Sequence, residues 1–319
     1  MSEGREGSAR REQAVVLGAS MAGLLAARQL ADHFERVTVV ERDELPTGPD
    51  GRKGVPQGAH AHGLLPSGYR VLDGYFPGMM AELQAAGAPM GDMGGDIAWF
   101  QYGGWKLREP VGLRGIFVSR PALESAVRAR VKALPNVDFF EGYDGEQPVF
   151  DAGAGVSGLV VKGRAGGTES TLAADLTVDA SGRGSQSAKW LERWGFEAPP
   201  TTSVRVNVGY ATRVFERRSE DLGGAIGAII AGTPPLERRF AAALAAEGDR
   251  WVVTLAASWG TTRRRTRRAG WRSRGRCRRG RCSSWRRGGR RKGRSRATGS
   301  RPISGITTSG WSDSPKDTW

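Results

Sequence analysis

A glycine-rich turn between an apolar strand and an apolar helix constrains the fold of this chain more than any other feature. Ala14 to Leu17 is a short apolar run typical of a buried parallel strand, and the turn from Gly18 to Gly23 follows it without a break. A mostly apolar helix begins in this turn, and Val37 to Glu41 has the composition of a second buried strand. The three segments form a βαβ unit, which predicts a parallel sheet and an α/β architecture.

The turn has the spacing of a dinucleotide-binding fingerprint, with Ser20 at the position of the second glycine. Gly18 allows the tight turn, Ser20 is small enough for the backbone to approach a pyrophosphate, and Gly23 allows close helix packing. The helix N-terminus would face the anion. Glu41 lies 18 residues after Gly23, where its carboxylate can accept hydrogen bonds from ribose hydroxyls and disfavours a 2′-phosphate. A glycine turn of some other α/β fold explains the strand, the spacing and the acid less well.

The positive charge of the chain is confined to its last residues. The formal net charge is +15, but residues 261–319 contain 18 Arg and 2 Lys against 2 Asp, which leaves 28 basic and 31 acidic groups in residues 1–260. A mildly acidic body argues against nucleic acid or another polyanion as its partner. Both cysteines, Cys277 and Cys282, lie in the same basic segment, so the body has no thiol for a disulfide or a thiolate metal site.

The chain also lacks the sequence features of a secreted or membrane-spanning protein. Residues 1–12 are polar and charged and contain no apolar core of a secretion signal. The longest weakly apolar run, Leu222 to Ala231, is far shorter than a transmembrane helix requires. Together with the cysteine usage, these features predict a cytoplasmic protein without a transmembrane segment.

Local patterns predict the elements that follow the βαβ unit. Residues 44–63 are rich in Gly, Pro and polar residues and predict a long loop of the kind that often lines a binding site. Ser119 and Pro121 are suited to start a helix that runs to Pro135. Residues 115–119 are expected to return to the core sheet. The other expected elements are helices within 64–86, strands at 97–100, 137–140, 176–179, 203–211 and 250–256, and a hairpin of 156–162 with 168–172.

Two more motifs place polar residues beside the expected sheet. Arg120 lies in the first turn of a helix after a strand, where a guanidinium can donate to a phosphate or ribose, although an isolated arginine is more often a surface residue. Asp179 to Ser185 forms a flexible polar turn after another buried strand, at the edge where open α/β sheets bind ligands. As an isolated string this second motif could be only a helix cap.

Together these motifs resemble the flavoprotein monooxygenase superfamily typified by aromatic hydroxylases, whose relatives include geranylgeranyl reductases and flavin-dependent halogenases. The resemblance covers roughly residues 13–258 and rests on the glycine turn with its acid, the Arg-x-x-Leu-Glu helix start and the segment after Asp179. It implies FAD as the cofactor. The implied contacts are Gly18, Ser20 and Gly23 with the pyrophosphate, Glu41 with the adenosine ribose, Arg42 and Arg120 with phosphates or ribose, and Asp179 as support of the FAD pocket.

The loop from Gly54 to Gly63 resembles a segment that lies near the isoalloxazine ring in actinobacterial-type members. This likeness implies flavin-proximal roles for Gln57, His60 and His62. The spacing of the two histidines would suit a metal site, but no third ligand accompanies them. We therefore expect no metal, and the sequence does not identify a catalytic base.

The chain departs from the superfamily beyond residue 258. Members close the FAD site with a late strand that ends in Gly-Asp before a helix, and this sequence contains no such segment. The Arg-rich residues from Thr261 onward have no apolar periodicity and predict a disordered tail. A truncation or a reading-frame change near Trp259 in a GC-rich gene would produce such a tail. Alternatively, the tail is a polybasic segment that binds nucleic acid or anionic membranes, with Trp271, Trp285 and Trp311 available for stacking.

The predicted fold class is therefore α/β: a three-layer Rossmann-like FAD-binding domain at residues 13–190 with a substrate-domain insertion at about 73–112, a partial β-rich substrate domain at 191–258, and disordered ends at 1–12 and 259–319. The resemblance implies an FAD-dependent oxidoreductase of the monooxygenase or hydroxylase type that uses NAD(P)H and O2 on a small organic substrate, with no specific nucleic-acid partner. A flavin-dependent prenyl-type reductase and a non-catalytic FAD-domain remnant are alternatives. A halogenase fits less well, because we find neither a suitably placed lysine nor a Trp-x-Trp-x-Ile segment.

Overall fold

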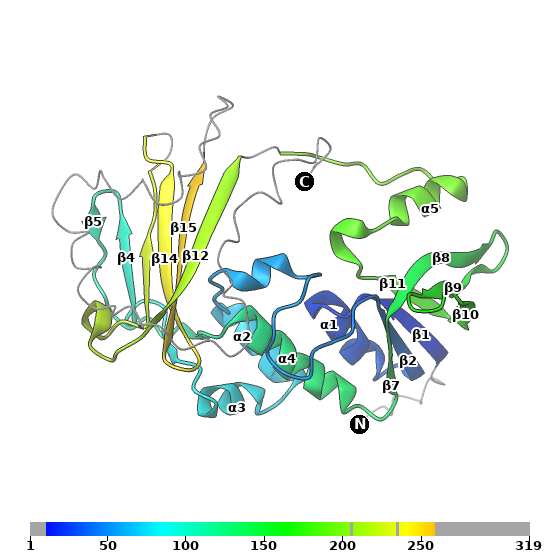
Figure 1. Ribbon diagram of the computed structural model, residues 1–319, viewed down its shortest axis with the longest axis horizontal. Coiled ribbons are helices and arrows are strands. Elements are labelled where there is room, and N and C mark those ends of the chain that lie inside the picture. The colour runs from blue at the N-terminus through cyan, green and yellow to red at the C-terminus, as the bar shows by residue number, and fades with distance from the viewer. Residues whose placement is uncertain (1–10, 205–206, 234–235, 259–319) are drawn as a thin grey trace, which may run out of the picture. The chain divides into compact units, whose positions relative to one another are not determined.

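The computed structural model describes residues 11–204, 207–233 and 236–258, which form two compact units (Figure 1). The described residues of Met1–Pro56 and Pro121–Thr201 make up unit 1. Those of Gln57–Arg120 and Thr202–Trp319 make up unit 2. The predictions for residues 1–10 and for the Arg-rich tail, including its frame-shift origin and its polyanion binding, lie outside the described residues.

Unit 1 is built on a four-stranded parallel sheet with the order β11–β1–β2–β7. Leu17 pairs with Val40 on one side and with Asp179 on the other. The carboxyl ends of β1, β2 and β11 therefore meet at one edge of the sheet. The residue range of each of these four strands includes one of the segments that the sequence predicts as a strand. They are β1 (Arg11–Leu17), β2 (Phe34–Glu41), β7 (Val137–Glu141) and β11 (Leu176–Asp179).

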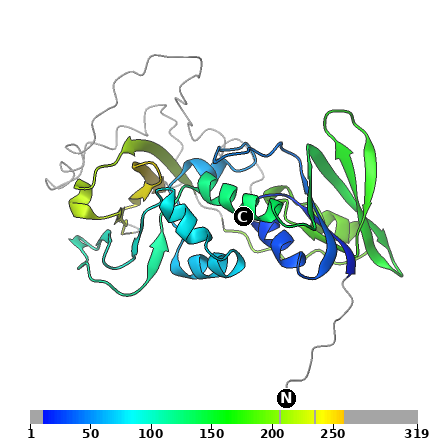
Figure 2. The same cartoon turned by 90° about the horizontal axis from the view of Figure 1, so that it is seen from below.

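Helices cover one face of this sheet, and a second sheet covers the other. α1 (Met21–Leu30) packs closely on its face, since a Cβ atom added to Gly23 would lie 3.4 Å from the Val16 side chain. α4 (Arg120–Lys132) runs beside α1 in both views (Figures 1 and 2). On the opposite face Val15 and Leu17 pack against an antiparallel sheet. That sheet consists of β8 (Tyr143–Asp151), β9 (Gly155–Gly163) and β10 (Glu169–Ala173). The predicted three-layer α/β fold is confirmed.

The expected hairpin is formed by β9 and β10, and β8 is a strand that local patterns do not indicate. Gly145 and Pro148 both disfavour a strand interior, but β8 lies at the edge of its sheet, where proline is tolerated. Its register shifts between Gly145 and Gln147. After β11 the chain forms η2 (Gly182–Gly184) and α5 (Ser187–Arg193). Trp194 then stacks on Phe150 of β8, with 4.5 Å between the ring centroids.

Unit 2 contains a six-stranded sheet with the order β12–β15–β14–β13–β4–β5. β15 contains the expected strand 250–256, but β12 contains only residues 208–211 of the strand expected at 203–211, since Ser203, Val204 and Asn207 are not in a strand. β4 is the strand expected outside the nucleotide-binding fold. β13 and β14 were not expected. The strands are β4 (Ile97–Gln101), β5 (Gly104–Trp105), β12 (Val208–Glu216), β13 (Gly227–Ile230), β14 (Arg239–Ala246) and β15 (Arg250–Ser258).

Further elements, mostly of unit 2, include the helices expected within residues 64–86. They are η1 (Pro56–Ala59), α2 (Pro66–Tyr75), α3 (Met79–Ala85), η3 (Asp221–Gly224) and two short strands, β3 (Met90–Asp92) and β6 (Arg114–Ile116). The prediction that residues 115–119 return to the core sheet is wrong, because β6 pairs antiparallel with β3. The strand that pairs with β2 at this edge of the parallel sheet is β7, in which Val137 lies opposite Val37.

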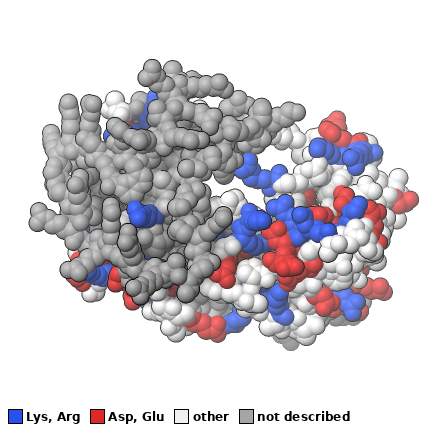
Figure 3. All heavy atoms as spheres, in the orientation of Figure 1, with Lys and Arg blue, Asp and Glu red and all other residues white. Residues whose placement is uncertain are grey.

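The surface of the described residues has no marked excess of one charge in the view of Figure 3, where acidic and basic side chains are interspersed. This agrees with the near balance of 28 basic and 31 acidic groups in residues 1–260. Among the helices of residues 11–258 that the structure describes, none has the length and apolar character needed to cross a membrane.

Candidate dinucleotide site

The turn after β1 requires glycine at two positions. Gly18 has a φ of +102°, in the left-handed region, and a Cβ atom there would lie 2.6 Å from the backbone oxygen of Ala180. The N–H of Gly18 donates to the backbone oxygen of Val40 at 2.7 Å, which ties the turn to β2. A Cβ atom on Gly23 would lie 1.7 Å from the backbone oxygen of Gly18. The first and last glycines of the predicted fingerprint are therefore both needed for α1 to begin directly on the turn.

The N-terminus of α1 is available to an anion. Ser20 is the N-cap residue, with an extended backbone, and its side chain makes no capping hydrogen bond. Its Oγ instead donates to Glu124 Oε2 at 3.1 Å. The first N–H groups of a helix have no partner within the helix, and together with the helix dipole they favour negative charge. This end of α1 can therefore receive a phosphate group.

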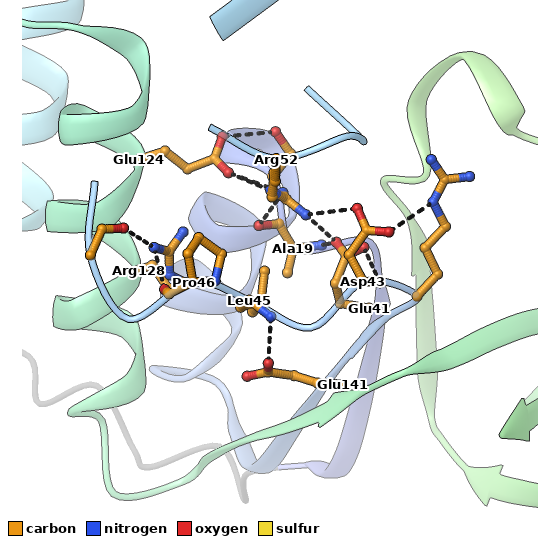
Figure 4. A network of polar contacts seen from close by, with 12 residues as sticks. Ala19, Glu41, Asp43, Leu45, Pro46, Arg52, Glu124, Arg128 and Glu141 are labelled. Atoms are coloured by element: carbon orange, nitrogen blue, oxygen red, sulfur yellow. Dashed lines mark hydrogen bonds and ion pairs between the residues drawn. The ribbon is translucent and has the colours of Figure 1, made fainter. Parts of the chain in front are cut away.

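Glu41 ends β2 as a buried carboxylate beside the glycine turn (Figure 4). Its Oε2 accepts a hydrogen bond from the N–H of Ala19 at 2.8 Å, and its Oε1 accepts one from the N–H of Asp43 at 3.1 Å. Burial alone would raise the pKa of Glu41, but these hydrogen bonds and the charge of Arg52 outweigh burial and lower the pKa below its ordinary value. Glu41 is thus held ionised at the position from which the sequence predicts ribose binding.

Arg52, which sequence reasoning missed as a site residue, links Glu41 to α4. Its Nη1 lies 3.0 Å from Glu41 Oε2, its Nε donates to Glu124 Oε1 at 3.0 Å, and its Nη2 donates to the Ala19 backbone oxygen at 3.0 Å. The three charged side chains are between 5% and 8% exposed. Burial would lower the pKa of Arg52, but the two carboxylates raise it above its ordinary value. The sequence contained one indication of this role, because Arg52 and Lys53 are adjacent cations in the loop that is expected to line a binding site.

The loop after β2 is fixed to its neighbours by buried polar contacts (Figure 4). Arg128 Nη2 on α4 donates to the backbone oxygens of Pro46 at 2.8 Å and Gly48 at 3.1 Å. The N–H of Leu45 donates to Glu141 Oε2 on β7 at 2.7 Å. Arg128 is only 5% exposed, so these bonds form out of contact with bulk water. The loop that carries Arg52 is therefore held in one arrangement by α4 and β7.

A cavity of about 580 Å³ lies beside the end of β2 in unit 1. It is lined by residues 42–44, 52–53, 141–143, 163–166 and 168. Asp43 Oδ2 is buried and makes no hydrogen bond within the part of the chain that the structure describes. Arg52 Nη1, at 4.0 Å, is too far away to donate one. A buried acceptor without a donor fits a ligand that brings hydroxyl or amino groups, and the volume is in the range of small-molecule sites.

The two arginines predicted to contact FAD occupy different environments. Arg42 follows β2 with its side chain 58% exposed, and its Nε lies 3.8 Å from Asp43 Oδ1. This long contact leaves the guanidinium able to turn toward the cavity that it lines. Arg120 is the first residue of α4 and is half-buried. That both arginines touch the cofactor stays a prediction.

Asp179 ends β11 and organises the polar turn that follows. Its Oδ1 accepts hydrogen bonds from the N–H of Ser181 at 2.9 Å and from its Oγ at 2.5 Å. Its Oδ2 accepts from Ser185 Oγ at 2.6 Å and from Ser187 Oγ at 3.1 Å. Burial would raise the pKa of Asp179, but these bonds together lower it. Because the N–H of Ala180 donates to the Leu17 backbone oxygen at 2.8 Å, the turn lies against the glycine turn.

The loop with the two histidines belongs to unit 2. Gln57 lies in η1 and is exposed. His60 Nδ1 is 2.8 Å from Thr212 Oγ1, and His62 Nδ1 donates to the His60 backbone oxygen at 2.9 Å. No group of three metal-ligating side chains is found among residues 11–204, 207–233 and 236–258. The flavin-proximal roles of these three residues stay predictions.

Relatives of this chain include proteins named kynurenine 3-monooxygenase. Protein Rv3254 of Mycobacterium tuberculosis is 37% identical over 259 residues, which are 79% of this chain and 54% of that protein. Kynurenine 3-monooxygenase of Salinispora arenicola is 35% identical over 181 residues, 54% of this chain and 36% of that enzyme. The chain thus spans about half the length of the first relative and less of the second. No protein-family model matches the chain.

Solved structures with this fold include FAD-dependent and flavin-dependent proteins. PqsL, a probable FAD-dependent monooxygenase from Pseudomonas aeruginosa, superposes with a TM-score of 0.59 at 15% identity, over 78% of this chain and 61% of PqsL. The p-nitrophenol 4-monooxygenase PnpA from Pseudomonas putida DLL-E4 has a TM-score of 0.56 at 19% identity, over 80% of this chain and 59% of PnpA. The flavin-dependent halogenase CmlS has a TM-score of 0.55 at 19% identity, over 78% of this chain and 42% of CmlS. The resemblance and the fold predicted from the sequence are confirmed.

Proposed function

We propose that this chain, which has the fold of the flavoprotein monooxygenase superfamily, binds FAD in unit 1 and acts as an oxidoreductase that oxygenates a small organic substrate. The observation that carries the proposal is the arrangement at the ends of β1 and β2. There an uncapped helix N-terminus, a turn that requires Gly18 and Gly23, and an ionised Glu41 lie side by side. The relative named kynurenine 3-monooxygenase favours the monooxygenase type.

The polar groups of unit 1 fit the adenosine diphosphate part of FAD. The N-terminus of α1, with Ser20, would hold the pyrophosphate. Three of about four lone-pair sites of the Glu41 carboxylate accept hydrogen bonds or face Arg52, which leaves one for a ribose hydroxyl. Asp43 Oδ2 would accept from the nucleoside in the cavity. Arg42 would contact phosphates or ribose, as the resemblance implies. The same role for Arg120, which is the first residue of α4 and belongs to unit 2, stays a prediction.

Asp179 would support the FAD pocket without touching the cofactor itself. Three serine hydroxyls already occupy its two oxygens, so its contribution is to order the turn whose Ala180 packs on Gly18. Bound FAD would supply the redox chemistry, with NAD(P)H as the reductant and O2 as the oxidant. The protein would position the substrate and keep water away.

A non-catalytic FAD-domain remnant is the second candidate. One observation favours it: the late Gly-Asp pair of the described residues, Gly248-Asp249, lies in the turn between β14 and β15 and not before a helix. A prenyl-type reductase would use the same unit 1 residues and differ only in the reaction of the reduced cofactor. The first question is therefore whether the chain retains FAD.

The deciding experiment is the visible spectrum of the purified full chain after FAD is added and the excess is removed. We expect a retained flavin band, and we expect Glu41→Gln to retain less flavin because an amide is a weaker acceptor for a ribose hydroxyl. NADH and NADPH oxidation with and without O2 then separates a monooxygenase from a reductase. Folded protein that retains no flavin would overturn the proposal in favour of the remnant.

A further inference from the structure

The loop from His60 to Gly63 lies on one face of the six-stranded sheet of unit 2. Side chains on this face form cross-strand rows, because β12, β15 and β14 are antiparallel neighbours and alternate residues point to the same side. Three successive rows are Tyr210–Ala256–Phe240, Thr212–Thr254–Ala242 and Val214–Val252–Leu244. The loop contacts the first two rows, and Ala61 packs against the cluster that contains Leu244 of the third row.

Two hydrogen bonds join the loop to the middle row, and a third within the row links them into a continuous chain. The N–H of Ala61 donates to Thr254 Oγ1 at 3.0 Å. Thr254 Oγ1 lies 2.7 Å from Thr212 Oγ1, and Thr212 Oγ1 lies 2.8 Å from His60 Nδ1. The backbone N–H can only donate, so Thr254 Oγ1 must accept at that end of the chain. The remaining question is the direction of the two bonds that follow.

Only one direction gives every hydrogen in the chain an acceptor. If Thr254 donates to Thr212 and Thr212 donates to His60 Nδ1, both hydroxyl hydrogens are used. If His60 donates instead, one of the two hydroxyl hydrogens has no acceptor among the described residues, although Thr254 is only 6% exposed and Thr212 is half-buried. An unsatisfied buried donor costs more than an ordinary hydrogen bond contributes, so the first direction is favoured.

We propose that the Thr254–Thr212 chain holds His60 as the neutral tautomer with hydrogen on Nε2, and that this N–H binds an uncharged oxygen acceptor of a ring-containing ligand. Thr212 and Thr254 are positioning residues for His60. His62 has the opposite tautomer, because its Nδ1 faces a backbone oxygen and must donate to it. Two histidines of one loop therefore carry their hydrogens on different ring nitrogens.

The surroundings of His60 determine the class of ligand. Its ring centroid lies 5.6 Å from that of Tyr210, and Tyr210 lies 5.9 Å from Phe240 in an edge-to-face arrangement. Tyr210 is 42% exposed and Phe240 is 39% exposed, so both present ring surface beside the imidazole. The titratable groups that face His60 are His62 and Tyr210, and among the described residues no carboxylate or lysine forms a hydrogen bond or ion pair with it. Aromatic surface beside a neutral donor suits a flat molecule with a carbonyl oxygen.

The uncharged state of His60 is consistent with its environment. Burial lowers the pKa of His60 below its ordinary value, and the electrostatic effect of the neighbouring His62 lowers it further. Acceptance of the Thr212 hydroxyl at Nδ1 acts in the same direction, since it stabilises the neutral form. That the ligand is the substrate of the enzyme rests on the proposed function, whereas the tautomer of His60 does not.

The tautomer can be read directly by NMR from the full chain with 15N-labelled histidine. The sequence contains three histidines, so single replacements assign every signal, including that of exposed His33, whose Nε2 lies 3.0 Å from Gln29 Nε2. We expect unprotonated Nδ1 and protonated Nε2 for His60 and the reverse for His62 at neutral pH. A proton on Nδ1 of His60 would overturn the proposal.

A matched pair of variants tests the hydroxyl chain. Thr212→Val has the same shape but no hydroxyl, so we expect His60 to become a mixture of tautomers with a raised pKa. Thr212→Ser retains the hydroxyl and should preserve the wild-type signals. Equal signals in the two variants would show that the hydroxyl chain does not hold His60, and would contradict the proposal.

The donor role is tested with two probes of nearly the same shape, acetophenone and α-methylstyrene, of which only the first carries an acceptor oxygen. Acetophenone should shift the His60 Nε2 signal and bind about fivefold more tightly than α-methylstyrene. His60→Ala should abolish this preference, and His60→Gln, whose amide can donate from a similar position, should restore part of it. Equal binding of the two probes by the wild type would overturn the donor role.

These readouts do not require bound flavin. If the chain retains no FAD but His60 has the expected tautomer and prefers acetophenone, the proposed function fails while the ligand site of unit 2 remains. If FAD is retained but the tautomer or the preference is absent, only the present inference fails.

Discussion

At the residue scale, Arg52 is the charge that allows the fold to bury two carboxylates beside the glycine turn. Glu41 and Glu124 are 6% and 4% exposed and lie on β2 and α4. Arg52 reaches both at 3.0 Å and also donates to the Ala19 backbone oxygen. A buried charge without a partner is strongly unfavourable, so the three side chains must be considered as one group.

Replacing Arg52 with Gln tests this group. We expect Arg52→Gln to lower the free energy of unfolding by about 3–5 kcal/mol at pH 7, because two buried carboxylates lose their partner. The pKa of Glu41 is lowered in the folded protein, so its contribution to stability is present above its unfolded value of 4.5 and is lost as the pH falls through the folded value. Without Arg52 the pKa of Glu41 rises. The difference in the free energy of unfolding between Arg52→Gln and the wild type should therefore become smaller below pH 4.5.

Urea unfolding at pH 7 and at pH 4 measures both parts of this prediction. Lys162→Ala is the control, since it removes only the exposed pair with Glu169 and should cost less than about 1 kcal/mol. A gap of the same size at both pH values would mean that Arg52 stabilises the fold by packing and not by its charge.

Residues such as Arg52 could not have been predicted from the sequence in the same way as Gly18 or Glu41. Gly18 directly follows β1 and Glu41 is the last residue of β2, so the position of each strand in the sheet determines the position of the residue in the site. Arg52 lies in the loop from Glu44 to Gly63, whose path is set by contacts with α4 and β7 that are distant in sequence. No local pattern separates such a buried arginine from a solvated one.

At the scale of elements, the loop after β2 depends on α4 for its arrangement. Arg128 supplies two hydrogen bonds to backbone oxygens of the loop, at Pro46 and Gly48. Its side chain is buried and cannot be replaced by water without rearrangement. α4 therefore determines both the charge partner of Arg52, through Glu124, and the path of the loop that carries Arg52.

Shortening Arg128 should release this loop while the helix remains. We expect Arg128→Ala to lower the free energy of unfolding by about 2–3 kcal/mol, since two hydrogen bonds from a charged donor to half-buried backbone oxygens are lost. Amide hydrogen exchange should accelerate in residues 44–50 and stay nearly unchanged in β1. Uniform acceleration over unit 1 would indicate that Arg128 stabilises the whole unit, and would contradict a local role.

The elements that the sequence did not predict are those defined by their neighbours. β14 is rich in alanine, which favours helices, yet it forms a strand because β13 and β15 pair with it on both sides. β8 contains Gly145 and Pro148 and is tolerated as an edge strand. β1, β2 and α1 carry strong local signals and are found where they were expected. β8 and β14 were not predicted because they form strands through pairing with other strands, and this pairing cannot be read from local sequence patterns.

At the scale of the molecule, ligand binding should reveal whether unit 1 alone forms the cofactor site. The glycine turn, Glu41, Arg52 and the cavity all belong to unit 1. A ligand that binds only the folded protein stabilises it by an amount set by its concentration relative to its dissociation constant. FAD should therefore stabilise the chain if the proposed function is right, whatever the substrate is.

Thermal unfolding with and without FAD measures this stabilisation, and two glycine variants make it specific. At FAD concentrations about 100-fold above the dissociation constant we expect a stabilisation of about 2.7 kcal/mol, or a rise in Tm of about 5–10 °C. Gly23→Ala should remove the shift, because its Cβ atom would lie 1.7 Å from the Gly18 oxygen. Gly74→Ala, within α2 and with no atom near its added Cβ, should stabilise the protein slightly and keep the full shift. If Gly23→Ala stays folded and shows the same shift as Gly74→Ala, FAD binds elsewhere than at the turn after β1.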